Sequence, residues 1–273
     1  MNSTIPERLY GIIGYPLGHS LSPALHNWAF GELGVAGVYM AWPTPKERLG
    51  DFIVSARTLP ISGVSVTIPH KQKVMGFLDG VSDRAKAVGA VNTLYWQEGA
   101  LLGENTDVYG FMGPLKGLSR MPGSALVLGS GGAARAVISG LKELGVREIF
   151  AANRTHERAL SLARDFGISA VPWEDRHKCV AELLVNATSL GMAGDEQDLS
   201  PLSETCLSPN QTVYDLVYNP LQTRFLRDAE HSGCRTIDGL SMFIHQAAAQ
   251  FRLWTGKDFS LDQGTALLAS ILY

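Results

Sequence analysis

Apolar and polar positions alternate with two different periods along most of the chain. Apolar runs at residues 9–14, 38–42 and 63–69 are typical of buried strands, whereas apolar residues recur every three or four positions at 24–33 and 45–56, which indicates helices. After residue 120 the alternation continues, and further strands are predicted at 126–128, 149–152, 170–172, 183–186, 213–217 and 235–237. Because strands that alternate with helices form parallel sheets, the pattern predicts an α/β fold.

Turn residues interrupt this pattern in the first half of the chain. Glu98 and Gly99 separate two apolar runs within residues 90–103, which predicts a β-hairpin. Pro69 ends the apolar run before it, and a helix is expected to start at residues 70–73. The remaining helices are predicted at 107–118, 133–144, 157–166, 223–232, 239–254 and 260–272.

A glycine-rich turn at residues 126–136 organises the second half of the chain. The apolar run there leads into Gly129, Gly131 and Ala134, with the spacing G-x-G-x-x-A, and a helix-forming segment follows. Glycines at these positions permit a tight turn and a close approach of the backbone to a pyrophosphate, which would then lie at a helix N-terminus. The turn therefore predicts a dinucleotide-binding unit; an ordinary glycine turn in an α/β sheet is the alternative.

The end of the next predicted strand indicates which dinucleotide is bound. Units that bind NAD carry an acidic residue about 20 residues beyond the glycine turn. This chain has Asn153, Arg154 and Thr155 there, with Arg158 four residues after Arg154. Two guanidinium groups suit the 2′-phosphate of NADP, because each can bind phosphate oxygens bidentately. The alternative is a helix start with Thr155 as its cap and two solvated arginines.

Polar side chains with possible chemistry also follow the strands of the first half. The loop after residues 9–14 contains Ser20 and Ser22, and Ser22 precedes Pro23 as a helix N-cap would. Thr67 lies at the C-terminal end of the strand predicted at 63–69, and Lys71 lies at the helix start beside it, where open α/β sheets bind ligands. For Lys71 the alternative is an ordinary solvated lysine.

Asp107 starts the predicted helix at 107–118, which links the two halves of the chain. An acidic residue in the first turn stabilises a helix through its dipole, so this could be its whole role. The strand ends at 186–189 and 215–220 are also polar, and we expect them on the ligand side of the second sheet.

Composition excludes several classes of protein. The chain has 273 residues, 45% hydrophobic and 18% charged, with a net charge of −3, so it can form one large or two ordinary domains and has no basic footprint for nucleic acid. Cys179, Cys206 and Cys234 lie far apart and are expected to be reduced thiols. The histidines, His19 among them, have no metal-ligand spacing either, and no metal site is predicted.

The first eight residues lack the basic-then-apolar pattern of a secretion signal. No apolar run approaches the length of a membrane-spanning helix. We therefore expect a cytoplasmic protein.

Many short motifs occur in the order found in one known family, and on them the chain resembles shikimate dehydrogenase over residues 14–256. The matching positions are 18–23, 26–27, 66–71, 89–93, 103, 105–107, 110, 129–134, 153–155, 158, 186–192, 215, 218–220, 223, 239, 242 and 246–248.

The resemblance implies reversible, NADPH-dependent reduction of 3-dehydroshikimate to shikimate, in the biosynthesis of chorismate and the aromatic amino acids. It implies two α/β domains around a cleft. Residues 1–106 and 240–273 would bind the substrate on a mostly parallel sheet, and residues 107–239 would form a Rossmann-type NADP domain. The expected partners are these small molecules, without nucleic acid or membrane, in a monomer or homodimer.

The resemblance also assigns roles to single residues. The positions that match Lys71 and Asp107 form the catalytic pair in the family, and those that match Ser20 and Ser22 bind the substrate carboxylate. Thr67, Asn92, Tyr218 and Gln246 match the rest of the substrate pocket. We assign the cofactor to a larger set, at the glycine turn, the arginine tip and later strand ends: Gly129, Ser130, Gly131, Gly132, Ala133, Asn153, Arg154, Thr155, Arg158, Thr188, Leu216, Gly239 and Met242.

One position departs from the family, which commonly has asparagine where this chain has Ser65. Serine has a shorter reach and fewer donors, so selectivity among hydroxylated acids is open. A quinate/shikimate dehydrogenase of broader specificity is one alternative. A nucleotide-sensing protein without catalysis is another, although such a protein would be expected to lack Lys71 or Asp107.

Overall fold

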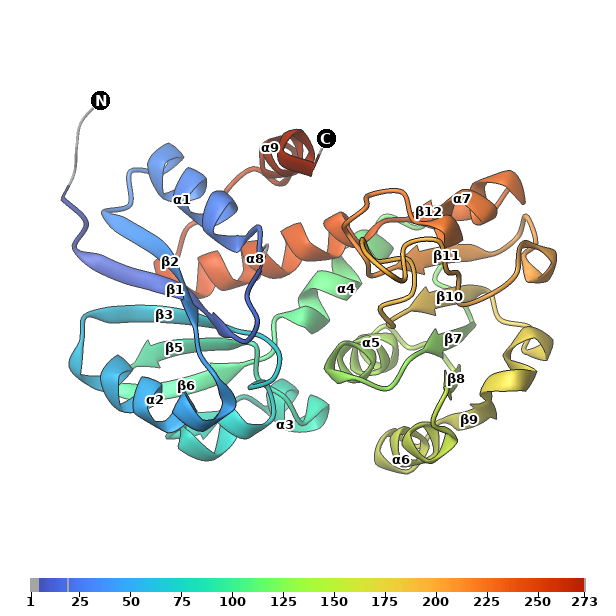
Figure 1. Ribbon diagram of the computed structural model, residues 1–273, viewed down its shortest axis with the longest axis horizontal. Coiled ribbons are helices and arrows are strands. Elements are labelled where there is room, and N and C mark those ends of the chain that lie inside the picture. Colours follow the sequence, from blue (N-terminus) through green and yellow to red (C-terminus); the bar gives the residue numbers. More distant parts are fainter. Residues whose placement is uncertain (1–4, 19, 273) are drawn as a thin grey trace. The chain divides into compact units, whose positions relative to one another are not determined.

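The computed structural model of the chain describes residues 5–18 and 20–272, which divide into two compact units (Figure 1). The first unit comprises the chain up to Thr106 together with Gln246–Ile271, and the second comprises Asp107–His245. In each unit, helices pack on a mostly parallel six-stranded sheet formed by the described residues. The predicted α/β class is confirmed.

The sheet of the first unit combines parallel strands with an antiparallel hairpin. β1 (Arg8–Gly14) lies between β2 (Gly37–Pro43) and β3 (Ile61–Val66) and is parallel to both. β5 (Thr93–Gln97) and β6 (Ala100–Glu104) form the predicted hairpin, and β4 (Gly80–Val81) pairs with β6. The turn residues Glu98 and Gly99 have φ angles of 51° and 80°, as the tight hairpin turns that match strand twist require.

Different helices cover the two faces of this sheet. α2 (Leu49–Thr58), preceded by the 3₁₀ segment η1 (Lys46–Arg48), packs on an apolar face that includes Val64 and Leu94. α1 (Ser22–Glu32) and residues from Gln246 onward in α8 (Gly239–Thr255) pack on the other face, around the rings of Tyr10, Tyr39 and Trp254. Because side chains alternate along a strand, Ser65 lies on this second face. The unit also contains η2 (Lys73–Phe77), α3 (Asp83–Val88) and α9 (Leu261–Leu272).

The sheet of the second unit is parallel throughout the described residues. Its strands are β7 (Ser124–Leu128), β8 (Glu148–Asn153), β9 (Ser169–Pro172), β10 (Leu183–Asn186), β11 (Thr212–Asp215) and β12 (Arg235–Ile237). Their order, β12-β11-β10-β7-β8-β9, is that of a doubly wound nucleotide-binding fold, in which the chain reverses direction beside the first strand. That reversal lies between β7 and β10, next to the glycine turn.

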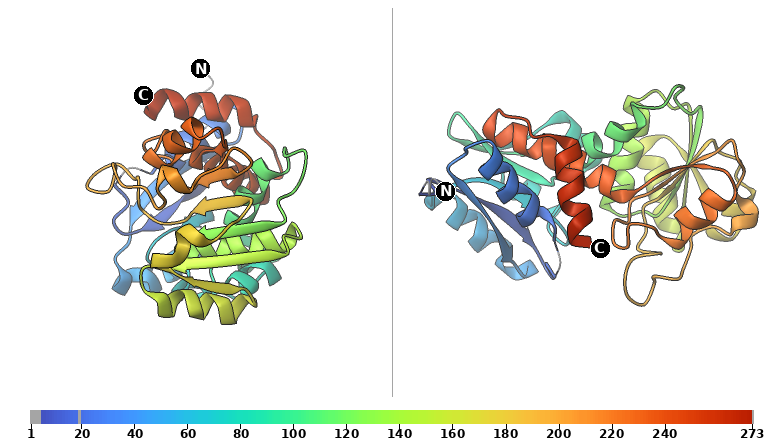
Figure 2. Two further views of the ribbon diagram at one scale, coloured as in Figure 1. Left: turned by 90° about the vertical axis from the view of Figure 1, so that its right-hand side faces the viewer. Right: turned by 90° about the horizontal axis from the view of Figure 1, so that it is seen from above.

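The helices of the second unit follow from this winding. α5 (Gly132–Glu143) and α6 (His156–Phe166) connect β7 to β8 and β8 to β9, and α7 (Arg224–His231) connects β11 to β12. Right-handed crossovers in the two directions place α7 on the opposite face from α5 and α6 (Figure 2). α4 (Asp107–Leu115) packs on α5. No helix within the described ranges is both long and apolar enough to cross a membrane.

Two local expectations were wrong. Residues 70–72 form turns before the 3₁₀ segment η2, with no α-helix, because the chain bends back so that the Val91 N–H donates to the Lys71 carbonyl at 2.7 Å. Ser22 is the first residue of α1, and the N-cap position is taken by Leu21. The β10–β11 connection contains the short 3₁₀ segment η4 (Glu204–Cys206) and no α-helix within its described residues.

Candidate active site

The glycine turn has the conformation that the sequence predicts. Gly129 has a φ of 117°, and a Cβ atom there would lie 2.7 Å from the Ala187 carbonyl oxygen, so a larger residue would not fit. Gly131 is the N-cap of α5, and a Cβ atom on it would meet nothing within 4 Å among the described residues. The first N–H groups of α5 therefore face open space without a side-chain cap. This arrangement suits the phosphates of a dinucleotide.

A hollow of about 180 Å³ lies beside this turn, within the second unit. Three segments line it, from the glycine turn, the end of β8 and the loop after β10. The residues are Gly129, Ser130, Gly131, Asn153, Arg154, Arg158, Trp173, Ala187, Thr188, Ser189, Leu190 and Glu196. Seven of the thirteen predicted cofactor residues are in this set.

The two arginines of the hollow are exposed and have no ion-pair partner within the described part of the chain. The Asn153 amide donates to the Thr155 carbonyl at 2.9 Å and holds the bend before α6. Thr155 is the N-cap of α6, but its hydroxyl makes no capping hydrogen bond with described residues. Helix capping therefore does not account for the polar residues at this strand end.

Six predicted cofactor residues lie outside the lining of the hollow. Gly132 and Ala133 form the start of α5, and Thr155 caps α6. Leu216 follows β11. Gly239 lies close to it, because a Cβ atom on Gly239 would be 2.5 Å from the Leu216 carbonyl oxygen. Met242 is 8% exposed, one turn along α8.

A buried carboxylate supports the loops behind the hollow. Asp215 is fully buried at the end of β11 and accepts hydrogen bonds from the Asn186 amide, the Val217 N–H and the Thr223 hydroxyl at 2.7–3.0 Å. Burial raises the pKa of Asp215 to about 6, although these three hydrogen bonds lower it in part. The Thr188 hydroxyl in turn donates to Asn186 Oδ1 at 2.6 Å. Asp215 thus fixes the loop that carries Thr188 into the hollow.

In the first unit, backbone hydrogen bonds bring together several predicted substrate residues. Thr67 follows β3, and its N–H donates to the Ile13 carbonyl at 2.9 Å. The Lys71 carbonyl accepts from Val91, and the neighbouring Asn92 is buried. Asn92 Oδ1 accepts from the Thr106 N–H at 2.7 Å, and Asn92 Nδ2 donates to the Thr106 hydroxyl at 3.0 Å. The Asp107 residue that begins α4 therefore follows directly after a residue bonded to Asn92.

The other predicted substrate residues lie in different elements. The Ser22 N–H donates to Ser20 Oγ at 3.3 Å, and Ser22 is 3% exposed. Gln246 is half-buried in α8, in the first unit. Tyr218 follows β11 in the second unit, where its ring packs on Phe243 and burial raises its pKa. His19 lies outside the described residues.

Family models match three segments of the chain. The shikimate dehydrogenase substrate binding domain matches residues 12–94, the shikimate/quinate 5-dehydrogenase family matches 119–193, and the shikimate 5′-dehydrogenase C-terminal domain matches 239–266. A protein of Oleidesulfovibrio alaskensis named shikimate dehydrogenase (NADP(+)) is 53% identical over 270 residues, which is 98% of this chain and 97% of that one. The chain belongs to the shikimate dehydrogenase family.

Solved structures of this family have the same fold. The crystal structure of shikimate dehydrogenase from Thermus thermophilus in complex with NADP(H) and shikimate has a TM-score of 0.88 and 42% identity, covering 96% of this chain and 98% of that one. A crystal structure of shikimate dehydrogenase in complex with NADP⁺ has a TM-score of 0.91 and 34% identity, covering 97% and 96%. The family predicted from the sequence motifs is confirmed.

Five residues that line the hollow are not among the thirteen predicted cofactor residues. Ala187, Ser189 and Leu190 lie within the family motif at 186–192, whereas Trp173 and Glu196 lie outside every predicted motif. Trp173 follows β9 after a proline, and Glu196 accepts a hydrogen bond from the Ser189 hydroxyl. Trp173 could have been suspected from its place directly after a strand. Glu196 carries no comparable signal, because it lies in a long connection without regular pattern.

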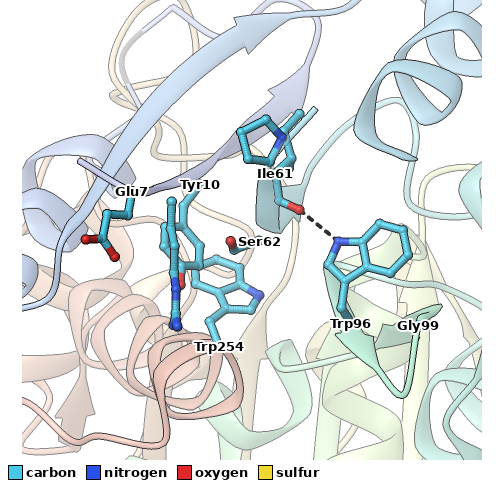
Figure 3. Close-up of a pocket in the computed structure, with 9 residues that line it drawn as sticks. Glu7, Tyr10, Ile61, Ser62, Trp96, Gly99 and Trp254 are labelled. Carbon is cyan, nitrogen blue, oxygen red and sulfur yellow. Dashed lines mark hydrogen bonds between the residues drawn. The ribbon is translucent and has the colours of Figure 1, made fainter. Parts of the chain in front are cut away.

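A second hollow, of about 390 Å³, lies in the first unit near the starts of β1 and β3 (Figure 3). It contains none of the predicted site residues, and its lining is Glu7, Arg8, Tyr10, Pro60, Ile61, Ser62, Trp96, Gly99 and Trp254. The indole N–H groups of Trp96 and Trp254 donate to the carbonyls of Ile61 and Leu94 at 2.8 and 2.9 Å. Parallel sheets bind ligands at the opposite strand ends, so size alone does not make this hollow the active site.

Proposed function

We propose that this chain is an NADP-dependent shikimate dehydrogenase that interconverts shikimate and 3-dehydroshikimate. The main support is the hollow in which the glycine turn and the Arg154–Arg158 pair lie together. The chain is also similar over nearly its whole length to relatives named shikimate dehydrogenase (NADP(+)). The reaction makes it an oxidoreductase that acts on a CH–OH group.

The residues present fit the cofactor. The first N–H groups of α5 bind the pyrophosphate, and the missing side chain of Gly131 leaves room for it, while Gly129 permits the tight turn against Ala187. Arg154 and Arg158 bind the 2′-phosphate, which has two negative charges to balance. When bound, NADP accepts or supplies the hydride at its nicotinamide ring.

The remaining assignments concern the proton and the substrate. When a ketone is reduced, negative charge develops on its oxygen, and Lys71 Nζ donates the proton there and takes it back in the reverse direction. Asp107 orients Lys71 and balances its charge. Ser20 and Ser22 bind the substrate carboxylate, and Thr67, Asn92, Tyr218 and Gln246 contact the rest of the ring.

Hydrogen bonds around Asn92 support the roles of Lys71 and Asp107. Lys71 and Asn92 are linked through neighbouring residues by hydrogen bonds, and Asp107 follows Thr106 in the same network. The carboxylate assignment to Ser20 and Ser22 stands on the family match and on their proximity in the chain. We also propose the cytoplasm as the location, because Cys179, Cys206 and Cys234 are all free thiols in the described structure.

A single set of assays tests the proposed function. Purified protein is mixed with shikimate or quinate and with NADP or NAD, and reduced cofactor is followed at its ultraviolet absorbance. Rapid turnover of shikimate with NADP is the expected result. Comparable turnover of quinate would make it a broad quinate/shikimate dehydrogenase. Tight NADP binding without turnover of either acid would contradict the proposed activity.

A further inference from the structure

A relay of buried hydrogen bonds connects Tyr39 with Asn92 inside the first unit. The Tyr39 hydroxyl is 2.7 Å from Ser65 Oγ, and Ser65 Oγ is 2.9 Å from Gln250 Oε1. Gln250 Nε2 is 2.9 Å from Thr93 Oγ1 and 3.2 Å from the Asn92 carbonyl, and Thr93 Oγ1 is 2.8 Å from Asn92 Oδ1. None of these residues is more than 5% exposed.

Backbone groups determine which atom donates and which accepts in each hydrogen bond of this relay. A backbone N–H can only donate, so the Thr106 N–H requires Asn92 Oδ1 as its acceptor. A carbonyl can only accept, so the Asn92 carbonyl requires Gln250 to present Nε2 to it and to Thr93. Gln250 Oε1 then faces Ser65 and accepts its proton, which leaves the Ser65 oxygen as the acceptor for Tyr39.

This polarity determines how Asn92 can contact a ligand. Its Oδ1 accepts from the Thr106 N–H, the Thr106 hydroxyl and the Thr93 hydroxyl, so it is saturated by protein donors. Toward any further group, the Asn92 amide therefore acts as a donor through Nδ2. An amide held in this orientation selects an oxygen acceptor, such as a hydroxyl or ketone oxygen of a cyclic acid.

The same relay reaches Ser22, one of the two residues proposed to bind the substrate carboxylate. Burial raises the pKa of Tyr39, and its side-chain hydrogen bonds with Ser65 and Ser22 partly offset this rise. Tyr39 also stacks on His26 at 4.6 Å between ring centroids, and its backbone bonds to Asn27 at 2.8 and 2.9 Å. Loss of the hydroxyl alone would therefore leave the ring in place.

We propose that Tyr39, Ser65 and Gln250 are positioning residues that, through Thr93 and together with the Thr106 N–H, hold Asn92 as a hydrogen-bond donor to the substrate. This inference rests on the proposed function, because Asn92 is a substrate residue only if the chain binds such an acid. It also gives Ser65 a role: its hydroxyl is used within the protein, between Tyr39 and Gln250, and does not replace the asparagine of the family at the substrate.

The first test compares two single-atom changes in the same unit. Tyr39→Phe removes the end of the relay, whereas Tyr10→Phe removes the hydroxyl of another fully buried tyrosine, one without a partner in the described residues. A lost hydrogen bond weakens binding by about 3- to 10-fold, so Tyr39→Phe should raise KM for shikimate by that factor and leave KM for NADP unchanged. Tyr10→Phe should change neither constant. Equal KM values for shikimate in the two variants would overturn the relay.

The second test measures how KM for shikimate depends on pH. A residue with a merely structural role would not change this dependence. In Gln250→Glu, the protonated carboxyl keeps an acceptor for Ser65 and one donor, which can serve either Thr93 or the Asn92 carbonyl, whereas the carboxylate can donate to neither. KM for shikimate in this variant should rise with pH as the carboxyl ionises, relative to the unaltered chain. A pH profile parallel to that of the unaltered chain would contradict the relay.

A spectroscopic readout separates failure of the relay from failure of the proposed function. If the unaltered chain does not oxidise shikimate with NADP, the proposed function is wrong. The relay is then tested by the NMR signals of the Asn92 side-chain amide without ligand. They should shift in Tyr39→Phe and stay in place in Tyr10→Phe, and unshifted signals in Tyr39→Phe would overturn the relay.

Discussion

At the scale of single residues, the proposed cofactor hollow carries charges that favour a dinucleotide with an additional phosphate. Arg154 and Arg158 face no acidic ion-pair partner in the described structure, while Glu196 lies on the lining and is hydrogen-bonded by Ser189. The positive pair therefore remains available for a phosphate group, and the carboxylate disfavours negative charge on its own side of the hollow.

Replacing Arg154 and Arg158 together by alanine should raise KM for NADP by roughly 10- to 100-fold, because charge-assisted hydrogen bonds to the 2′-phosphate are lost. KM for NAD, which has no such phosphate, should change little. Initial rates with both cofactors measure this difference. The control is Arg164→Ala, a change at an exposed position near the end of α6, the helix that also contains Arg158. Equal losses for NADP and NAD would refute the 2′-phosphate assignment.

Replacing Lys71 by alanine should lower kcat by about 10²- to 10⁴-fold with little change in KM for shikimate, because a positioned acid/base is lost. Lys73→Ala, two residues along and exposed at the start of η2, is the matched control and should keep its activity. Steady-state kinetics separates the two constants. A normal kcat with a much higher KM would identify Lys71 as a binding residue instead.

At the scale of elements, the ends of β10 and β11 act together through one buried carboxylate. Asp215 accepts from Asn186 and Thr223, and the Thr223 hydroxyl also caps α7 by accepting from the Leu226 N–H at 3.2 Å. Two strand ends and a helix start thus depend on the same side chain, whose charge is buried without a cation among the described residues.

The raised pKa of Asp215 makes the stability of these elements depend on pH. The folded value of about 6 exceeds the ordinary value of 3.8, so the folded chain binds the proton more tightly. The resulting stabilisation is complete below pH 3.8 and is lost as the pH rises through 6, at no more than about 1.4 kcal/mol per pH unit. Asp215→Asn should remove this slope from the free energy of unfolding, measured with denaturant between pH 4 and 7. Asp195→Asn, at an exposed site, should retain it.

The elements differ in how far the sequence predicts them. The second sheet follows from apolar runs and from glycines whose conformations allow no other residue, and its strands lie within a few residues of their expected bounds. The segment at 70–73 has a local helix signal, but a bond between Lys71 and Val91 overrides it. β4 has only two residues, too few for any pattern.

The candidate site divides in the same way. Arg154, Arg158 and the glycine turn stand out because their role depends on residues adjacent in the chain. The bond between Ser65 and Gln250 joins positions 185 residues apart, and neither residue has a local pattern that would indicate it. Such contacts exist only after the sheet and helix α8 have packed.

At the scale of the whole molecule, a buried histidine limits tolerance to acid. His26 is fully buried among the rings of Tyr39, Phe251 and Trp254, and burial lowers its pKa from 6.5 to about 3. Its neutral form therefore stabilises the fold above pH 6.5, and this contribution is lost as the pH falls toward 3.

The free energy of unfolding should consequently fall by about 3 kcal/mol from this residue between pH 7 and pH 4. His26→Phe should reduce the acid slope, whatever its stability at neutral pH, whereas His231→Asn at an exposed position should retain it. Denaturant titrations at several pH values compare the slopes. An unchanged slope in His26→Phe would show that other groups cause the acid sensitivity.

Helix α8 belongs to both units, since the boundary between them falls after His245. On the ribosome, the residues of the second unit up to that boundary are synthesised before Gln246–Ile271. The nucleotide-binding sheet can therefore close early, while the first unit still lacks Gln250 and Trp254 and has the surface around Tyr39 uncovered. The order of synthesis thus allows the proposed cofactor hollow to form before Gln250 makes its hydrogen bonds to Asn92 and Thr93.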